Sequence, residues 1–98
     1  TGSVFGVQTR LDRSKVELRG DSTVYSRKGD ENNHTIHFHF CPKCGSTVYY
    51  EAGWMPGSIA VPVGAFSDPT LPAPVMHIYG NRKHHWVQLP EGCSEFLG

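Results

Sequence analysis

The sequence predicts a mainly β fold built from short strands. Its 98 residues include 11 Gly and 7 Pro, a composition that favours frequent turns. Apolar and polar side chains alternate in several segments, most clearly in HTIHFHF, residues 34–40. No stretch of ten or more residues combines helical periodicity with helix caps. These observations predict a single domain over residues 1–98, made of small antiparallel sheets.

Eight segments have the alternation or the composition of a strand, and turn residues bound each of them. They are residues 3–8, 15–20, 22–27, 34–40, 46–52, 58–66, 75–80 and 85–90. Pro62 lacks the N–H that a sheet ladder needs, so the sixth segment is expected to be an edge strand or to be interrupted. Residues 31–33 are expected to form a polar turn.

Charge and hydropathy narrow the possible partners. Nine Lys and Arg balance nine Asp and Glu, so no overall positive field attracts a phosphate backbone, and a nucleic-acid partner is unlikely on this ground. The basic stretch RKHHW (82–86) is best read as a solvated turn, with nucleic-acid or anionic-ligand contact as alternatives. Its Trp86 is expected in or near the core. The longest nearly apolar stretch, residues 59–66, is far shorter than a membrane span.

The cysteines indicate a metal site. Three is an odd number, which argues against a complete disulfide framework. Cys41 and Cys44, at Cys-x-x-Cys spacing before Gly45, are interpreted as thiolate ligands of Zn²⁺ in a reducing compartment, hence a cytoplasmic protein. Cys93 is isolated, and a small packed residue is its simplest interpretation.

The two cysteines lie between two expected strands, residues 34–40 and 46–52, and therefore at a hairpin tip. Pro42 and Gly45 would shape a tight knuckle in which backbone N–H groups can point at the sulfurs. A redox Cys-x-x-Cys would instead begin a helix beside a βαβ unit. The residues after Gly45 are β-branched and aromatic, a poor helix start, so the metal interpretation is preferred.

A tetrahedral zinc site needs two more ligands than this turn supplies. In the strand 34–40, Ile36 and the two Phe residues share one face, and His37 and His39 share the other face with Cys41. These histidines, His34, Cys93 or a partner chain could complete the site. Each histidine alone is more often a solvent-facing strand residue, so ligands outside the chain remain the preferred explanation.

An ordered series of segments resembles the glutathione-dependent formaldehyde-activating enzyme family, whose relatives include centromere protein V. The segments are TGSVFGVQ (1–8), VELRGDSTVY (16–25), FCPKCGSTVYY (40–50), GSIAVPVGAFSDP (57–69) and LPAPVMHIYGNRKHHWVQLP (71–90). The Cys-Pro-x-Cys-Gly-Ser piece alone would match many zinc ribbons. The later Gly-x-x-x-Asp-Pro step, followed by the Pro, His-Ile and Trp-Val series, makes the resemblance specific.

The resemblance implies a zinc-pinned, mostly β fold of the tent type. It implies that Cys41 and Cys44 join an upstream Cys-x-Cys pair in a structural four-thiolate zinc site. A separate upstream cysteine trio would hold a catalytic zinc. Neither upstream group lies within residues 1–98, so the missing ligands are expected from a preceding segment, or the chain is a shortened gene product that fills the site differently.

The implied activity is that of a carbon–sulfur lyase acting on small thiol adducts such as S-hydroxymethylglutathione, formed from glutathione and formaldehyde. Zinc would lower the proton affinity of the thiol and orient it. The alternative is a non-catalytic zinc-stabilised β scaffold or binding module. His77 lies in a strand-like segment and is best read as a strand residue, with an approach to the substrate site as the alternative.

Overall fold

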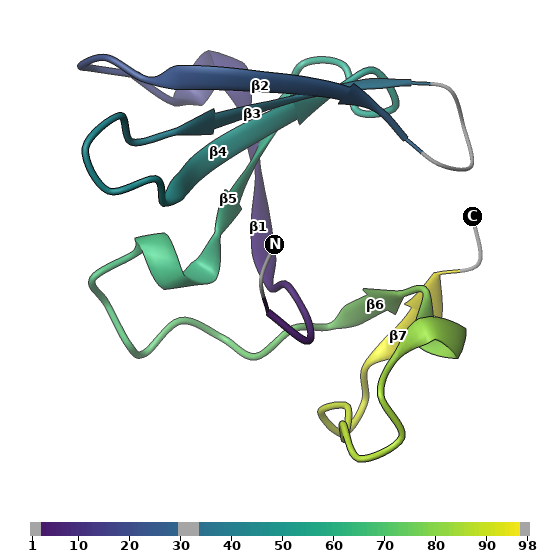
Figure 1. Cartoon of the computed structure of the whole chain (residues 1–98). Helices are drawn as coiled ribbons and strands as arrows, with labels where there is room; N and C mark the ends of the chain where they lie inside the picture. Colours follow the sequence, from purple (N-terminus) through teal and green to yellow (C-terminus); the bar gives the residue numbers. More distant parts are fainter. Residues whose placement is uncertain (1–2, 30–33, 97–98) are drawn as a thin grey trace. The chain divides into compact units, whose positions relative to one another are not determined.

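The computed structural model of the chain describes residues 3–29 and 34–96 (Figure 1). Within these residues it contains seven β-strands, three short 3₁₀ turns and no α-helix, which confirms the mainly β prediction. The polar turn expected at residues 31–33 lies outside the described residues. The chain divides into two compact units, Gln8–Ser67 and a smaller one formed by Thr1–Val7 with Asp68–Gly98.

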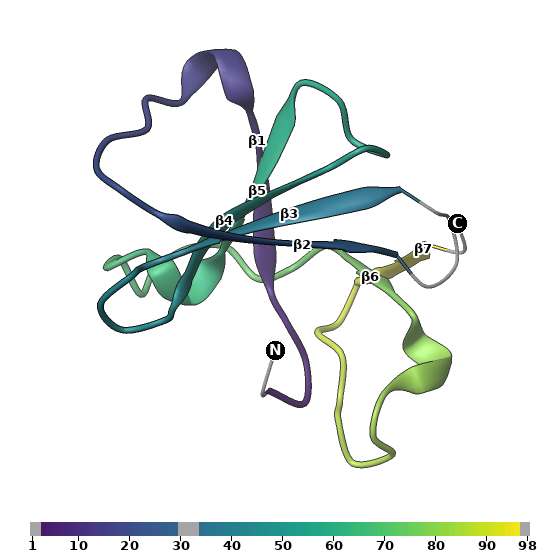
Figure 2. The ribbon, with the colours of Figure 1, turned by 45° about the horizontal axis from the view of Figure 1, so that its top comes forward.

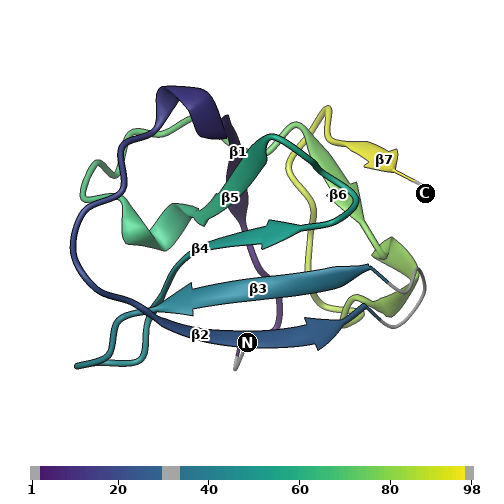
Figure 3. The ribbon, with the colours of Figure 1, turned by 90° about the horizontal axis from the view of Figure 1, so that it is seen from above.

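The larger unit is a five-stranded antiparallel sheet with the strand order β1-β5-β4-β3-β2 (Figure 3). Its strands are β1 (Gln8–Asp12), β2 (Thr23–Lys28), β3 (Thr35–Phe40), β4 (Thr47–Ala52) and β5 (Ser58–Pro62). Consecutive strands from β2 to β5 pair with one another, and β1 pairs with β5. The sheet is strongly twisted, as Figure 2 shows from the steep course of β1 and β5 across β2 and β3.

An aromatic row crosses the middle of this sheet. Tyr25, Phe38 and Tyr50 are cross-strand neighbours on β2, β3 and β4. Their ring centroids lie 6.4 Å apart for Tyr25 and Phe38 and 5.4 Å apart for Phe38 and Tyr50. Each such cross-strand pair contributes roughly 0.2–1 kcal/mol to the stability of the sheet, and the pairs favour this strand register over one shifted by a residue.

The core of the larger unit is small. Its buried apolar residues are Ala52, Met55, Ile59 and Ala60. Ala52, Met55 and Ala60 form one cluster, and Ile36 and Tyr50 pack against it. The side chain of Ile59 has no exposed surface. A core of this size provides little hydrophobic stabilisation, so a small domain of this kind benefits from an additional covalent or metal link.

The smaller unit holds a second sheet of two strands, β6 (Met76–Ile78) and β7 (Ser94–Phe96). These two strands are parallel, whereas the sequence predicts only antiparallel sheets. The connection between them, residues 79–93, is a long crossover that includes a 3₁₀ turn, η3 (Gly80–Arg82), and not a tight hairpin. Parallel pairing requires a connection of this kind.

The predictions of two strands near the start of the chain are wrong. Of residues 3–8 only Gln8 is in a strand, and residues 15–20 contain none. Strand β1 ends at Asp12, whose carboxylate accepts hydrogen bonds from the backbone N–H and the hydroxyl of Ser14, at 3.0 and 2.7 Å. This Asx-type capping starts the turn η1 (Arg13–Lys15) and competes with strand geometry.

For residues 58–66 the interruption expected at Pro62 is confirmed, and the edge-strand alternative is wrong because β5 lies between β1 and β4. The strand ends at Pro62 and continues as the turn η2 (Val63–Ala65), the interruption that the proline predicts. Residues 85–90 form no strand, and Trp86 is 60% exposed instead of packed in the core. Its ring stacks on His84, and a turn bond joins the N–H of Val87 to the carbonyl of His84 at 3.0 Å.

We predict that Ile59→Ala lowers the free energy of unfolding by about 3 kcal/mol and Ile59→Val by about 1 kcal/mol, because the removed methyl groups leave a cavity. Urea denaturation of the two variants measures both values. Val48→Ala, at a side chain that is 40% exposed, is the control and should cost clearly less. Equal losses at both positions would contradict the full burial of the Ile59 side chain.

Candidate metal centre

Cys41 and Cys44 lie at the tip of the β3–β4 hairpin, as the sequence predicts. The N–H of Cys41 donates to the carbonyl of Ser46 at 2.9 Å, and the N–H of Gly45 donates to the carbonyl of Cys41 at 2.8 Å. Gly45 has φ +79°, the left-handed region in which glycine is favoured. These two hydrogen bonds and the Gly45 conformation close the turn and hold both cysteines in it.

Hydrogen bonds at this tip reach both sulfurs, and they favour the thiolate form of Cys44. The N–H of Lys43 points at Cys41 Sγ, 3.4 Å away. Hydrogen bonds from the Ser46 side chain, then from the Ser46 backbone, then with Cys41, hold the pKa of the Cys44 thiol below its ordinary value. Because the thiolate is the form that binds metal, the tip is suited to supply two zinc ligands.

The structure gives no support to the redox interpretation of Cys-x-x-Cys. Strand β4 begins at Thr47, directly after the turn, so no helix N-terminus lies behind either sulfur. All three cysteines of the chain are free thiols: Cys41 is partly buried, Cys44 is exposed, and Cys93 is partly buried in the smaller unit.

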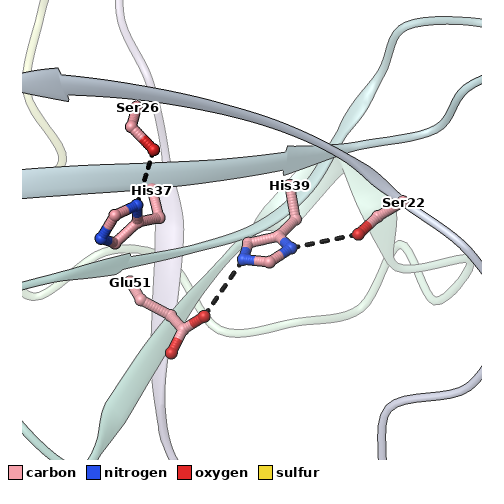
Figure 4. A network of polar contacts seen from close by, with 5 residues as sticks. All are labelled: Ser22, Ser26, His37, His39 and Glu51. Carbon is pink, nitrogen blue, oxygen red and sulfur yellow. Dashed lines mark hydrogen bonds and ion pairs between the residues drawn. The ribbon is translucent and has the colours of Figure 1, made fainter.

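The histidines suggested as further ligands are engaged elsewhere. His39 is hydrogen-bonded through Nδ1 to Ser22 Oγ and through Nε2 to Glu51 Oε1, both at 3.1 Å (Figure 4). His37 Nδ1 is hydrogen-bonded to Ser26 Oγ at 2.6 Å. Across residues 3–29 and 34–96, no group of three or more His, Cys, Asp or Glu side chains is placed to hold a metal.

The remaining suggested histidine, His34, lies at the opposite end of β3 from Cys41. A Cβ added to Gly53 would meet its Nδ1 at 2.9 Å, which shows how closely the ring packs against that glycine. The described residues therefore supply two thiolates and no third ligand at the hairpin tip.

Sequence reasoning identified the cysteine pair but missed the polar network around His39. The ring of His39 also stacks on Tyr49, with centroids 4.1 Å apart. Its side chain is only 15% exposed, so two hydrogen bonds and a stacked ring fix it in place. Ser22 and Glu51 become its partners through the pairing of β3 with its neighbours, which the sequence predicts only approximately.

Two further side chains, Trp54 and His77, have well-defined surroundings in the structure. Trp54 is 37% exposed and carries the Arg10 guanidinium 5.2 Å from its ring centroid, a cation–π contact. His77 is partly buried in β6 opposite Glu95 of β7. Its buried Nδ1 finds no hydrogen-bond partner among the described residues.

The fold and the site together define a small, mainly β protein with a Cys-x-x-Cys pair at a hairpin tip. The model of the family described as glutathione-dependent formaldehyde-activating enzyme matches residues 1–82, and the chain belongs to this family. No curated protein and no solved structure matches it. Over the described residues, none of the helical turns is long and apolar enough to cross a membrane.

We predict that Gly45→Ala destabilises the chain by about 1–2 kcal/mol, because a side chain in the left-handed region is strained. Gly64→Ala is the matched control: a Cβ at either position meets no atom within 4 Å, but Gly64 does not have a left-handed φ. Thermal melts of the two variants compare them. A Gly45 variant as stable as the Gly64 variant would show that the tip does not need this conformation.

We predict that Ser46→Ala raises the pH at which Cys44 becomes reactive. The hydrogen bond from the Ser46 hydroxyl is the largest cause that lowers the Cys44 pKa, so its loss moves this pKa toward its ordinary value, while the hydrogen bond from the residue 46 backbone remains. Iodoacetamide labelling across pH, in chelator and followed by mass spectrometry at Cys44, measures the midpoint. Ser67→Ala should leave the midpoint in place, and an unchanged midpoint in Ser46→Ala would argue against the serine's role.

Proposed function

We propose that this chain is the zinc-binding β domain of a carbon–sulfur lyase that acts on adducts of glutathione and formaldehyde, such as S-hydroxymethylglutathione. Cys41 and Cys44 would supply two thiolates to Zn²⁺. The observation that carries the proposal is the closed hairpin tip, with an N–H directed at Cys41 Sγ and a lowered Cys44 pKa, inside the family-matched segment.

The donors at the tip fit zinc. Thiolates bind Zn²⁺ at about 2.3 Å, and a Cys-x-x-Cys turn can fill two corners of a tetrahedron. The described residues supply no third ligand there, so we propose that the remaining ligands come from outside them. Free thiols at the site require a reducing compartment, which supports the cytoplasm as the location.

The reaction joins the sulfur of glutathione to the carbon of formaldehyde. The S–H bond of glutathione and the π bond of the carbonyl break, and a C–S bond and an O–H bond form. The adduct is therefore a hemithioacetal, and no electrons are exchanged with another reactant. A bound zinc ion at a site with an open position would supply stabilisation of the thiolate form. The contribution of this chain is the preformed tip, which holds Cys41 and Cys44 and favours the deprotonated state of Cys44.

The second candidate function is a non-catalytic zinc-stabilised scaffold or binding module. The scaffold function is favoured by the small number of possible metal ligands. The described residues provide the cysteine pair and no group of three or more side chains that could hold a second metal. A site of this kind that is closed by other ligands would stabilise the fold and leave no position for a substrate sulfur.

We predict that the chain binds zinc through both cysteines. Cys41→Ser and Cys44→Ser should each lower zinc content and melting temperature together, since structural zinc can contribute on the order of 10 kcal/mol in small domains. Cys93→Ser is the matched control and should change neither. Metal analysis of each purified variant, with melts in zinc and in chelator, gives both readouts.

A rate measurement separates the two functions. Exchange NMR of glutathione with formaldehyde measures how fast the adduct forms with and without the protein. The rate is measured with the protein that also carries the proposed further ligands: zinc held by Cys41 and Cys44 with adduct formation faster than the spontaneous rate supports the lyase, and zinc held there with the spontaneous rate supports the scaffold. A chain that holds no zinc and melts identically in chelator would refute both.

A further inference from the structure

We propose that the loop of residues 79–86 binds single-stranded nucleic acid, with a base stacked on Trp86 and a phosphate held by Lys83. This 79–86 loop belongs to the connection between β6 and β7, which extends away from both strands (Figure 1). Residues 81–86 are all exposed. The proposal concerns a surface of the smaller unit and does not depend on zinc binding or on the proposed function.

Charge is distributed unevenly along the chain. Basic and acidic residues balance overall, but residues 69–90 contain Arg82 and Lys83 and no Asp or Glu. One carboxylate borders the start of the loop, because Glu95 Oε1 would lie 3.4 Å from a Cβ added to Gly80. The phosphate contact is therefore assigned to Lys83, whose side chain forms no hydrogen bond or ion pair with the described residues.

Two aromatic rings are held at the surface of this loop. The Trp86 ring stacks on His84, with centroids 5.6 Å apart and planes inclined by 23°, and Trp86 is still 60% exposed. Tyr79 is 44% exposed and carries the Arg82 guanidinium 4.8 Å from its ring centroid. Exposed rings beside cations are the combination with which proteins bind single strands, because each nucleotide offers a planar base and a phosphate.

Backbone hydrogen bonds shape the loop before a partner binds. The N–H of Arg82 donates to the carbonyl of Tyr79 at 2.8 Å, and the N–H of Val87 donates to the carbonyl of His84 at 3.0 Å. Tyr79 has φ +56°, so the chain turns sharply directly after β6. A loop formed by two successive turns loses less conformational entropy on binding than an unstructured one.

The side chains favour this partner over two others. An acidic peptide would pair with the cations but would leave the exposed ring of Trp86 without a planar partner. Stable binding to an anionic membrane takes a cluster of about four to eight basic residues, and the loop has Arg82 and Lys83. Because these two cations neutralise few phosphates, we expect weak binding, with a Kd on the order of 10⁻⁵ M.

Fluorescence anisotropy of a labelled oligothymidylate of about ten nucleotides tests the proposal with the full chain, and an oligouridylate of the same length tests RNA. Trp86→Ala should weaken binding by about tenfold, because the base loses the ring on which it stacks. Trp54→Ala is the matched control: it removes the tryptophan of the larger unit and should leave the affinity near that of the parent chain. Melts of both variants show that they remain folded.

Lys83→Gln tests the phosphate contact separately. Each phosphate neutralised on a single strand contributes about −0.7 to the slope of log affinity against log salt, so this variant should make the slope less steep by about that amount. Lys28→Gln makes the same charge change on the exposed strand β2 of the larger unit and should leave the slope in place.

Binding of either oligonucleotide with these effects supports the proposal. No binding at low salt, equal losses in the Trp86 and Trp54 variants, or equal slopes in the Lys83 and Lys28 variants would overturn it. Polyphosphate, which has phosphates but no bases, should bind more weakly than the oligonucleotides, and equal affinity would make the loop a general anion site. Tighter binding of a polyglutamate peptide would make it a surface for acidic proteins, and either result would also overturn the proposal.

Discussion

The structure depends on how the β3–β4 hairpin closes. Beyond His39 the pairing of the two strands shifts by one residue, so that Phe40 lies opposite Thr47 and Val48 becomes the extra residue of a bulge. The same shifted register continues into the tip, where the N–H of Cys41 donates to the carbonyl of Ser46. Cys44 lies in the loop that this hydrogen bond closes. Without the shift, Cys41 would face Thr47, and the tip would be a different turn. The bulge and the left-handed Gly45 thus place both sulfurs on one short loop.

The same register organises both faces of the sheet. On one face it aligns the aromatic row Tyr25, Phe38 and Tyr50. On the other it stacks His39 on Tyr49 and places Glu51 within hydrogen-bonding distance of the imidazole. Burial raises the pKa of the Tyr50 phenol, so this ring stays neutral in the core face. The cysteine pair and the polar network are therefore neighbours that share strands, but both ring nitrogens of His39 are hydrogen-bonded, to Ser22 and Glu51.

Local pattern predicted the centre of the sheet better than its ends. The alternation in residues 34–40 and 46–52 located β3 and β4 because those strands have an apolar and a polar face. The segments 15–20 and 85–90 have strand-like composition, yet side-chain capping by Asp12 and a turn at His84 take precedence there. Strand β7 is only three residues long, and its pairing with β6 depends on a distant contact that periodicity does not reveal. The cysteine pair was predictable from spacing, whereas Ser46, Ser22 and Glu51 required the register.

X-ray absorption at the zinc edge of the zinc-loaded protein tests the central claim most directly, because it reports the ligand atoms themselves. The account predicts a sulfur shell at about 2.3 Å that loses two sulfur atoms in the double variant Cys41→Ser with Cys44→Ser. A shell of nitrogen and oxygen only, or a sulfur shell unchanged in the double variant, would contradict it.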